Sequence, residues 1–588
     1  MRLPSLVSLA QRAREVLLRF PWTLAAGVVA AVAVVVATTK SADVQWVRIG
    51  MVAALGLPLT IAMTLLAEER GWSWRLSAAL NAGAVLLLVL FYLIWPGPEQ
   101  KHEVIRYLQL SASLHLMVAF LPFLGRNESR AFWQYNHRLF LSILRAGVFS
   151  LVLYVGLMIA LVALDKLFGV DVPELVYPRL GIVILFIVNT WIFLAEVPRG
   201  LSELASDTSY PTVLKVFAQY ILTPLVFTYL FILLAYLVKI VASGEWPSGW
   251  IGWLVTSVAA SGLLGFLLVH PLRDDADEGW IRIYARWVFI GLIPSAVMLL
   301  AAFWKRILPY GLTELRLLGI LLGIWLLAIA VNYTLKQEAG IRRIPVTLAA
   351  LLLLTLYGPL SLTALSLRSQ GRRLADLVAG PREGSRTDRE ASAALLFLLE
   401  HGDKEGVAAA VPGTLPALDW DSIPRSYRQR QQAGARVLAG VQMNFDEYSR
   451  GSAAAHLHGD QVHLNALRNR ATPSAGYDWV LDVSSTDAKP RLAGADSVHV
   501  WFDTTVSVAR VAVGPDSLAF DLGRLAGAVA GKSVLTRNDI PTEDLRLEAV
   551  TSRRRGALVL QALRARRTGD SLRVESWEGK LLLGRPGR

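Results

Sequence analysis

The residues of this sequence that could do chemistry are a few polar side chains inside long apolar segments. His115, Asn189 and Glu196 each lie within, or at the end of, a run of about twenty mostly apolar residues. A charged group at the centre of such a run costs about 2.5–3.5 kcal/mol if the run lies in lipid, so these positions are natural places to look for function. One hypothesis makes His115 a proton-exchanging group, with Asn189 and Glu196 as ligands of a cation or substrate.

The same three residues also have a structural interpretation. Asparagine side chains bond across helix interfaces, which contributes about 0.6 kcal/mol each. A glutamate at a helix end can extend its carboxylate to the membrane surface. Proton pumps and secondary transporters usually carry charged pairs deep in several spans, and this sequence does not. The structural interpretation is therefore favoured.

A second candidate is the segment YGLTE, which connects two apolar runs. Tyr310 and Gly311 open it, and glycine permits an unusual backbone turn. Thr313 is placed to cap the following helix, with Glu314 in its first turn, where a negative charge is favoured. Arg316 is placed to pair with Glu314 or with a lipid phosphate. The alternative is a helix-to-helix corner without any function, and the sequence leaves both readings open.

Metal and nucleotide chemistry have weaker support. His456, His458 and His463 form the run HLHGDQVH, and two histidines two apart on a strand share a face that could bind zinc, but a solvated loop is preferred. The chain has no cysteine, which excludes disulfides, thiolate metal sites and cysteine nucleophiles. The phosphate-loop, nucleophile-elbow and His-Glu-x-x-His motifs do not occur. We therefore name no catalytic, cofactor or metal residue, and the balance leans against an enzyme.

The elements that carry these residues are predicted to be membrane-spanning helices. The chain of 588 residues is 54% hydrophobic and only 18% charged, whereas soluble domains are about 25% charged. Its mean hydropathy is +0.45, and the apolar residues are concentrated before Arg368. A span needs about 20 apolar residues. This rule predicts a helical membrane domain over 21–368, after a basic amphipathic segment 1–20, with eleven spans near 21–39, 49–67, 76–95, 104–124, 143–164, 180–197, 216–239, 250–269, 286–304, 315–335 and 345–366.

Loop charges predict the orientation of these spans. The net charge of +13 comes mostly from residues at predicted helix ends, where it favours lipid head groups over nucleic acid as the partner. If the N-terminus is cytoplasmic, the inside loops carry more arginine and lysine than the outside loops. An odd number of spans then places the C-terminal region outside the cytoplasm. The cluster Arg368, Arg372 and Arg373 argues mildly against this, and one span more or fewer would invert it.

The C-terminal region is predicted to be soluble. Residues 369–450 form a helical linker with an amphipathic helix at Asp388–His401. Residues 451–588 form a β-rich α+β domain, in which a short helix, Arg524–Ala530, interrupts the strands. Turn residues separate short alternating segments there, which is the pattern of a small sandwich or barrel. These segments are Trp479–Val483, Val498–Phe502, Ser507–Val513, Leu518–Leu522, Leu545–Val550, Ala557–Leu563 and Leu572–Ser576.

Three segments together resemble a known family. They are Asn136–Phe140 (NHRLF), Lys305–Arg316 (KRILPYGLTELR) and Gly358–Arg373 (GPLSLTALSLRSQGRR). The chain resembles a bacterial multi-pass membrane family catalogued as domain of unknown function 4153. The resemblance implies a protein of the bacterial plasma membrane, and it supplies no activity and no catalytic residues.

Two classes of function are favoured over a third, a membrane-embedded transferase acting on lipid-linked substrates, for which the sequence has no recognisable acid–base pair. In the first, a membrane-anchored scaffold or sensor presents a soluble β-rich binding domain; its partners are the lipid bilayer and a protein or envelope component. In the second, the protein is a transporter or channel for a small or lipidic substrate. The number of spans and the prolines Pro224 and Pro294 motivate it, because a proline frees a backbone carbonyl that can line a cavity.

Overall fold

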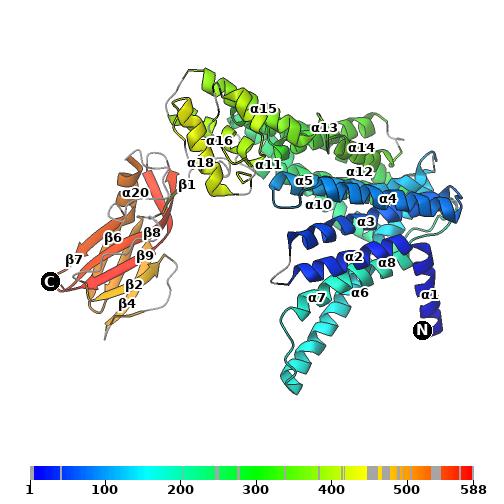
Figure 1. Ribbon diagram of the computed structural model, residues 1–588, viewed down its shortest axis with the longest axis horizontal. Helices are drawn as coiled ribbons and strands as arrows, with labels where there is room; N and C mark the ends of the chain where they lie inside the picture. The colour runs from blue at the N-terminus through cyan, green and yellow to red at the C-terminus, as the bar shows by residue number, and fades with distance from the viewer. Residues whose placement is uncertain are drawn as a thin grey trace. The chain divides into compact units, whose positions relative to one another are not determined.

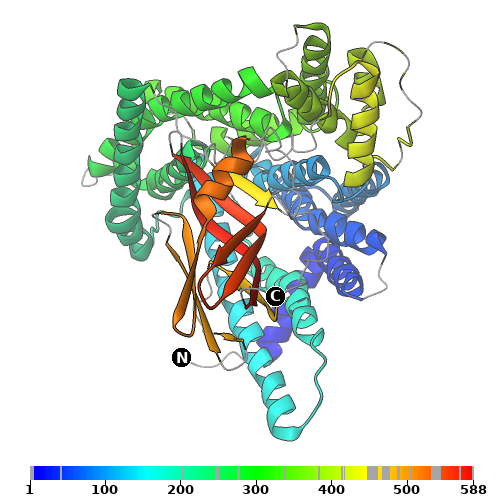
Figure 2. The same ribbon diagram turned by 90° about the vertical axis from the view of Figure 1, so that its left-hand side faces the viewer.

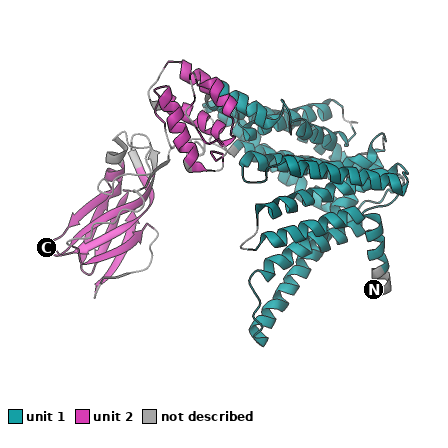
Figure 3. Ribbon diagram, in the orientation of Figure 1, with its two compact units in different colours: residues 1–372 teal, residues 373–588 magenta. Residues whose placement is uncertain are grey.

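The computed structural model divides the chain into two compact units, which are described separately (Figure 3). Unit 1 is Met1–Arg372 and unit 2 is Arg373–Arg588. The residues that the structure describes are 6–39, 43–126, 128–201, 203–244, 250–274, 279–336, 340–381, 385–411, 413, 415, 418–420, 422–424, 426–445, 461–465, 477–485, 491–493, 496–503, 506–531, 545–568 and 571–585.

The regular elements in the described part of unit 1 are all helical, and the last of these helices continues past Arg372 (Figure 1). Two of its segments, η2 and η4, are π-helical, and η1, η3 and η5 are short 3₁₀ turns. In chain order its elements are α1 (Leu6–Arg19), α2 (Pro21–Ala37), α3 (Val44–Glu69), α4 (Trp74–Ile94), α5 (Lys101–Phe120), η1 (Leu121–Phe123), α6 (Ser129–Phe168), α7 (Val176–Val183), η2 (Ile184–Asn189), α8 (Thr190–Ala195), η3 (Glu203–Ala205), α9 (Thr212–Val216), η4 (Phe217–Leu222), α10 (Thr223–Ser243), α11 (Trp250–Val269), η5 (His270–Asp274), α12 (Gly279–Tyr310), α13 (Glu314–Leu335), α14 (Arg343–Leu354) and α15 (Leu362–Ala379).

The predicted eleven spans are confirmed only in part. Within the described residues, nine helical segments are long and apolar enough to cross a membrane. A tenth is possible if α1 and α2, which meet at an angle of 93°, form one bent span. The count of eleven is not confirmed, because the predicted continuous helix over 345–366 is wrong: α14 ends at Leu354. Gly358 there has φ +81° and precedes Pro359, and a residue before proline disfavours the helical conformation.

Hydrogen bonds between helix termini show which termini lie together at each end of unit 1. At one end, which we call the Arg19 end, the Arg19 guanidinium donates to the carbonyl of Val197, just after α8 (2.7 Å). At the same end Arg342, just before α14, donates to the carbonyl of Phe123, just after α5 (2.6 Å). The ends of α1, α5 and α8 are therefore held by guanidinium–carbonyl bonds.

The opposite end of unit 1, which we call the Arg48 end, is joined in the same way. Arg48, near the start of α3, donates to the carbonyl of Trp95, which follows α4 (2.5 Å). Arg179 on α7 donates to the hydroxyl of Thr38, which follows α2 (2.9 Å). Successive helices thus begin and end at alternate ends of the bundle.

Residues 342–357 run alongside α5 from one end to the other. Just after the end of α5, the carbonyl of Phe123 accepts from Arg342, and in the middle of α5 Gln109 donates to the hydroxyl of Thr355 (3.1 Å). Nearer the start of α5, the Arg106 guanidinium lies over the ring of Tyr357 (4.8 Å). Although the 12 residues of α14 are only about 18 Å long, the chain beyond Leu354 continues along α5. The chain therefore reaches the Arg48 end before α15 begins.

Unit 2 contains helices and two antiparallel sheets (Figures 1 and 2). Its elements are α16 (Ser385–Glu400), α17 (Lys404–Ala410), α18 (Tyr427–Gly440), β1 (Gln461–Asn465), β2 (Trp479–Ser484), β3 (Arg491–Ala493), β4 (Asp496–Asp503), β5 (Val508–Val513), β6 (Asp516–Asp521), α20 (Leu522–Gly531), β7 (Arg546–Val550), β8 (Arg555–Thr568) and β9 (Ser571–Gly584). One sheet has the order β1-β8-β9-β2, with β7 also paired to β8, and the other has the order β3-β4-β5-β6.

A single apolar core joins the two sheets. Val511 and Phe520 of the four-stranded sheet pack in one cluster with Leu560, Trp577 and Leu581 of the five-stranded sheet, and all are at most 1% exposed. Shared burial of alternate residues is typical of sheets that face each other. The seven predicted strands fall on β2 and β4–β9 and the predicted short helix falls on α20, whereas β1, β3, α17 and α18 were not predicted as elements.

Candidate functional site

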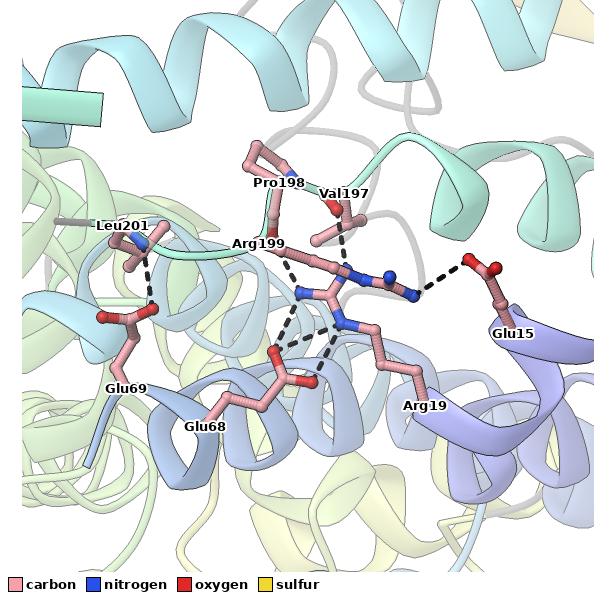
Figure 4. A network of polar contacts seen from close by, with 8 residues as sticks. All are labelled: Glu15, Arg19, Glu68, Glu69, Val197, Pro198, Arg199 and Leu201. Carbon is pink, nitrogen blue, oxygen red and sulfur yellow. Dashed lines mark hydrogen bonds and ion pairs between the residues drawn. The ribbon is translucent and has the colours of Figure 1, made fainter. Parts of the chain in front are cut away.

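A network of polar contacts surrounds Arg19 at one end of unit 1 (Figure 4). Its guanidinium donates from Nε and Nη2 to both oxygens of Glu68 at the end of α3 (2.8–3.2 Å). It also donates to the carbonyls of Val197 and Pro198, each at 2.7 Å. The Arg19 side chain is only 10% exposed. One cation therefore joins α1, α3 and the loop after α8, and its donors are used in holding these elements together.

A second carboxylate extends the network along the same end. Glu69 receives the guanidinium of Arg126 at 2.8 Å through one oxygen, and the backbone N–H of Leu201 at 3.1 Å through the other. At the opposite edge, Arg199 approaches Glu15 of α1 at 3.4 Å. The loop 197–201 is thus fixed from both sides, as Figure 4 shows.

Next to Arg126 lies a cleft of about 290 Å³. It is formed where the end of α5, the start of α6 and the loop before α14 meet. Its walls combine three arginines and one carboxylate with apolar and small residues: Phe123, Arg126, Glu128, Ser129, Phe132, Gly340, Ile341, Arg342 and Arg343. This cleft is the candidate site that the geometry supplies, and the sequence did not indicate it.

The three intramembrane candidates are not brought together in one site. His115 is exposed on α5, and its Nδ1 lies 2.8 Å from the carbonyl of Ser111 on the same helix. Asn189 lies in the π-helical segment η2 and accepts from the hydroxyl of Ser150 on α6 (3.2 Å). Both contacts agree with the structural interpretation of these residues, in which they bond to groups on the helices. Their functional roles stay a prediction.

Glu196 has a partner that the sequence did not indicate. Arg145 on α6 donates to one of its oxygens from Nη2 (2.6 Å) and Nε (2.7 Å). The two side chains are 49% and 30% exposed, so the pair lies at the surface of unit 1 and holds α8 against α6.

The corner at 310–316 is built differently from the prediction. Gly311 has φ +65°, the left-handed conformation that favours glycine. Thr313 precedes α13 but makes no side-chain capping bond, so that prediction is wrong. Arg316 donates to the carbonyls of Tyr310, the last residue of α12, and Gly311 (3.2 and 2.9 Å). Glu314, at the start of α13, is 6% exposed.

Helix α15 holds this corner from outside the YGLTE segment. Gln370, which is 3% exposed, donates to the carbonyls of Tyr310 (3.0 Å) and Leu312 (2.8 Å). Ser369 accepts the backbone N–H of Leu312 at 3.0 Å. Two of the three segments that carry the family resemblance therefore meet here, and the contact is structural.

A buried charged cluster at the start of α5 was missed. Glu103 is 4% exposed, and one of its oxygens lies 2.5 Å from Arg106 and 3.3 Å from His102. The Arg106 guanidinium also lies over the ring of Tyr357 (4.8 Å). The sequence could have indicated this cluster. His102, Glu103 and Arg106 lie in the first two turns of an apolar run, and Arg106 follows the other two at the spacings of three and four residues that bring side chains together on a helix.

The three polar residues of the NHRLF segment on α6 make three different kinds of contact. Asn136 donates to the carbonyl of Ala119 on α5 (3.1 Å). Arg138 pairs with Asp207 in the loop before α9 (2.6 Å). Hydrogen bonds from Ser209 and the Arg138 guanidinium lower the pKa of Asp207. His137 stacks on Trp133 (4.7 Å), and both of its ring nitrogens are buried without a hydrogen-bond partner among the described residues.

Most of the histidine run HLHGDQVH lies outside the residues that the structure describes. His456 and His458 lie outside the described residues, and His463 lies on β1, where only the backbone is described. Elsewhere in the described chain, no group of three or more His, Asp or Glu side chains is arranged to hold a metal ion.

Comparisons with known proteins find a family match that lies mainly on the helical unit. The family described as "Domain of unknown function (DUF4153)" matches residues 26–384. An uncharacterized protein of Pasteurella multocida is 26% identical over 280 residues, which are 46% of this chain and 45% of that protein, so the chain spans less than half the length of this relative. No solved structure matches the chain. Since the match covers more than half of the sequence and includes the NHRLF segment, the 310–316 corner and the cleft, the chain belongs to the DUF4153 family, a membrane-type family of unknown function.

Proposed function

We propose that the protein is a membrane-anchored scaffold or sensor, in which unit 1 is the anchor and the two-sheet domain of unit 2 binds a protein or envelope component. The observation that carries this proposal is how the polar groups of unit 1 are used. Arg19, Glu196 and Gln370 each bond to residues on other helices or loops of unit 1. Such bonds between helices stabilise a bundle, as expected of an anchor.

The β-rich domain has the features of a binding module. It has an apolar core of its own, and it exposes large aromatic side chains on two strands: Trp479 on β2 is 42% exposed and Trp501 on β4 is 46% exposed. Exposed tryptophans are enriched in the parts of interfaces that contribute most binding energy.

The proposed location is the bacterial inner membrane, with unit 2 outside the cytoplasm. Two observations support this orientation. The N-terminal segment and the loops of the Arg19 end hold most of the basic loop residues, which favours the cytoplasm for that end. Residues 342–357 then carry the chain along α5 to the Arg48 end, where Gln370 of α15 bonds to the 310–312 turn. The last residues of unit 1 therefore lie at the end of unit 1 opposite to Arg19.

A chain ending at residue 380 tests the scaffold proposal. It keeps Ser369 and Gln370 and so preserves the 310–312 corner. We expect this chain to insert and remain stable, and to fail to restore the phenotype of a deletion strain. Photo-crosslinking residues at positions 479 and 501 of the full chain should capture one and the same partner, and a matched position on exposed Glu405 of α17 should not. Full restoration by the shortened chain would contradict the proposal.

A transport function has one observation in its favour. The π-helical segments η2 and η4 interrupt two helical spans, and such segments recur at functional sites. Pro294 does not break its helix, since α12 is continuous from Gly279 to Tyr310. Flux of a small or lipidic substrate into vesicles that contain the chain ending at residue 380 would favour transport over anchoring.

A further inference from the structure

The cleft at the Arg19 end has a positive wall that the anchoring function does not require. Arg126, Arg342 and Arg343 line it, and Glu128 is the one carboxylate on its described lining. Arg126 is already neutralised by Glu69, which lies behind it (2.8 Å). Arg342 and Arg343 together therefore outweigh Glu128 by one positive charge.

The guanidinium groups of Arg342 and Arg343 are each held through one nitrogen, Nη1. Arg342 uses Nη1 for the carbonyls of Phe123 (2.6 Å) and Arg126. Arg343 uses Nη1 for the side-chain oxygen of Asn332 on α13 (3.2 Å). Anchoring through a single nitrogen restrains a guanidinium and leaves its other donors available.

Those other donors are not used elsewhere in the described chain. All of the hydrogen bonds of Arg342 and Arg343 to described residues come from Nη1, so Nε and Nη2 of both side chains remain available for a ligand. An arginine presents its donors in a fork that matches the oxygens of a phosphate or carboxylate. Two such forks from neighbouring residues suit an anion with more than two acceptor oxygens, which favours a phosphate.

The start of α6 provides a second, independent feature. Ser129 lines the cleft and is the first residue of this 40-residue helix. The residue before it, Glu128, makes no side-chain capping bond. The first N–H groups of a helix lack partners within the helix, and together with the helix dipole they favour an anion.

The position of the cleft suits a ligand at the membrane surface. It lies where the candidate spans Lys101–Phe123, Ser129–Phe168 and Glu314–Leu335 end or begin. The phosphates of lipid head groups lie at this level, and basic pockets between helices are typical head-group sites. A volume of about 290 Å³ is at the lower limit of small-molecule sites, so it suits a head group and not a larger ligand.

From these features we propose that the cleft binds the phosphate group of an anionic ligand, with Arg342 and Arg343 donating to its oxygens at the start of α6. A lipid head group and a free phosphate share this chemistry, and the experiment separates them. The site is independent of the scaffold function: it is in unit 1, whereas the proposed binding domain is in unit 2.

The test uses the purified full chain in detergent micelles. Short-chain phosphatidylglycerol, short-chain phosphatidylcholine and inorganic phosphate are titrated separately, and binding is followed by the rise in Tm and by native mass spectrometry. We expect phosphatidylglycerol to bind more tightly than phosphatidylcholine. Arg343→Gln should weaken the binding about tenfold, as the loss of a charged hydrogen-bond donor does. Arg343→Lys, which keeps the charge without the fork, should fall between the two.

Arg130→Gln is the matched control. Arg130 is exposed one residue after Ser129 and does not line the cleft, so its loss should leave binding unchanged. Tight binding of inorganic phosphate that depends on Arg343 would support the proposal and identify a soluble phosphate as the ligand. Equal binding by the Arg343→Gln and wild-type chains, or an equal loss in Arg130→Gln, would overturn it.

Discussion

The guanidinium of Arg106 on α5 lies 4.8 Å from the ring centre of Tyr357, which follows α14. Arg106 also pairs with buried Glu103 at 2.5 Å. Together with the Arg342–Phe123 bond at the other end, this contact places residues 342–357 beside α5 over most of its length. The 12-residue helix α14 and the residues after it therefore cross unit 1 from one end to the other, and we call this crossing of the chain the passage.

This passage predicts the side from which unit 2 can be labelled. The chain has no cysteine, so single cysteines can be introduced without removing any. Lys101→Cys at the start of α5 and Glu405→Cys on α17 should react with an impermeant thiol reagent from the same side of the membrane. Arg75→Cys, near the start of α4, should react only from the opposite side. Labelling of Glu405→Cys and Arg75→Cys from one common side would contradict the passage and the proposed orientation.

Arg19→Gln should destabilise unit 1 strongly. The substitution removes the ion pair with Glu68 and the bonds to two carbonyls of the loop after α8. Breaking a largely buried pair costs about 3–5 kcal/mol, and the 37% exposure of Glu68 reduces this to about 2 kcal/mol. The Tm of the chain in detergent measures the loss. Arg14→Gln, an exposed change on the same helix, is the control and should leave Tm nearly unchanged.

Gln370→Ala should loosen the corner between α12 and α13. It removes both amide bonds to the carbonyls of Tyr310 and Leu312, and the expected loss is about 2 kcal/mol. Limited proteolysis at the corner, together with Tm, reports the change. Arg372→Gln is exposed on the same helix and serves as the control. If both variants lost the same stability, the corner would not depend on Gln370.

His137→Phe should stabilise the protein by about 1 kcal/mol. Both ring nitrogens of His137 are buried without a partner among the described residues, and a phenyl ring can keep the stacking on Trp133. His115→Phe on the exposed face of α5 is the control and should change stability by less than about 0.5 kcal/mol. A lower Tm in His137→Phe would show that the imidazole makes a bond that the described residues do not provide.

The Arg138–Asp207 pair predicts a defined response to acid. Since Ser209 and Arg138 lower the pKa of Asp207 in the folded chain, this carboxylate stabilises the fold above its unfolded pKa of about 3.9. That contribution is lost as the pH falls through the lower, folded pKa. The Tm difference between wild type and Asp207→Asn should therefore shrink as the pH falls from about 6 to about 3. A difference that stays constant over this range would exclude Asp207 as the group responsible.

The amino-acid sequence alone determined the classes of element and their approximate places. Apolar runs of about twenty residues can satisfy their backbone groups in lipid only as helices, so the membrane unit followed from hydropathy. Alternating segments after Gln461 identified most strands, because a strand buries every second side chain. The family resemblance at Asn136–Phe140 was likewise contained in the order of residues, and it is confirmed.

Tertiary structure alone decided which of these elements touch and therefore where a site lies. Hydropathy is the same on both sides of a break, so it did not show that α14 ends at Leu354. The cleft joins Phe123 to Arg342, which are 219 residues apart, and no periodicity records such a pairing. Thr313 had the right type and position to cap a helix, yet Gln370 from another helix holds that corner. Local pattern fixes the burial of one element at a time, whereas a site is made by the packing of several.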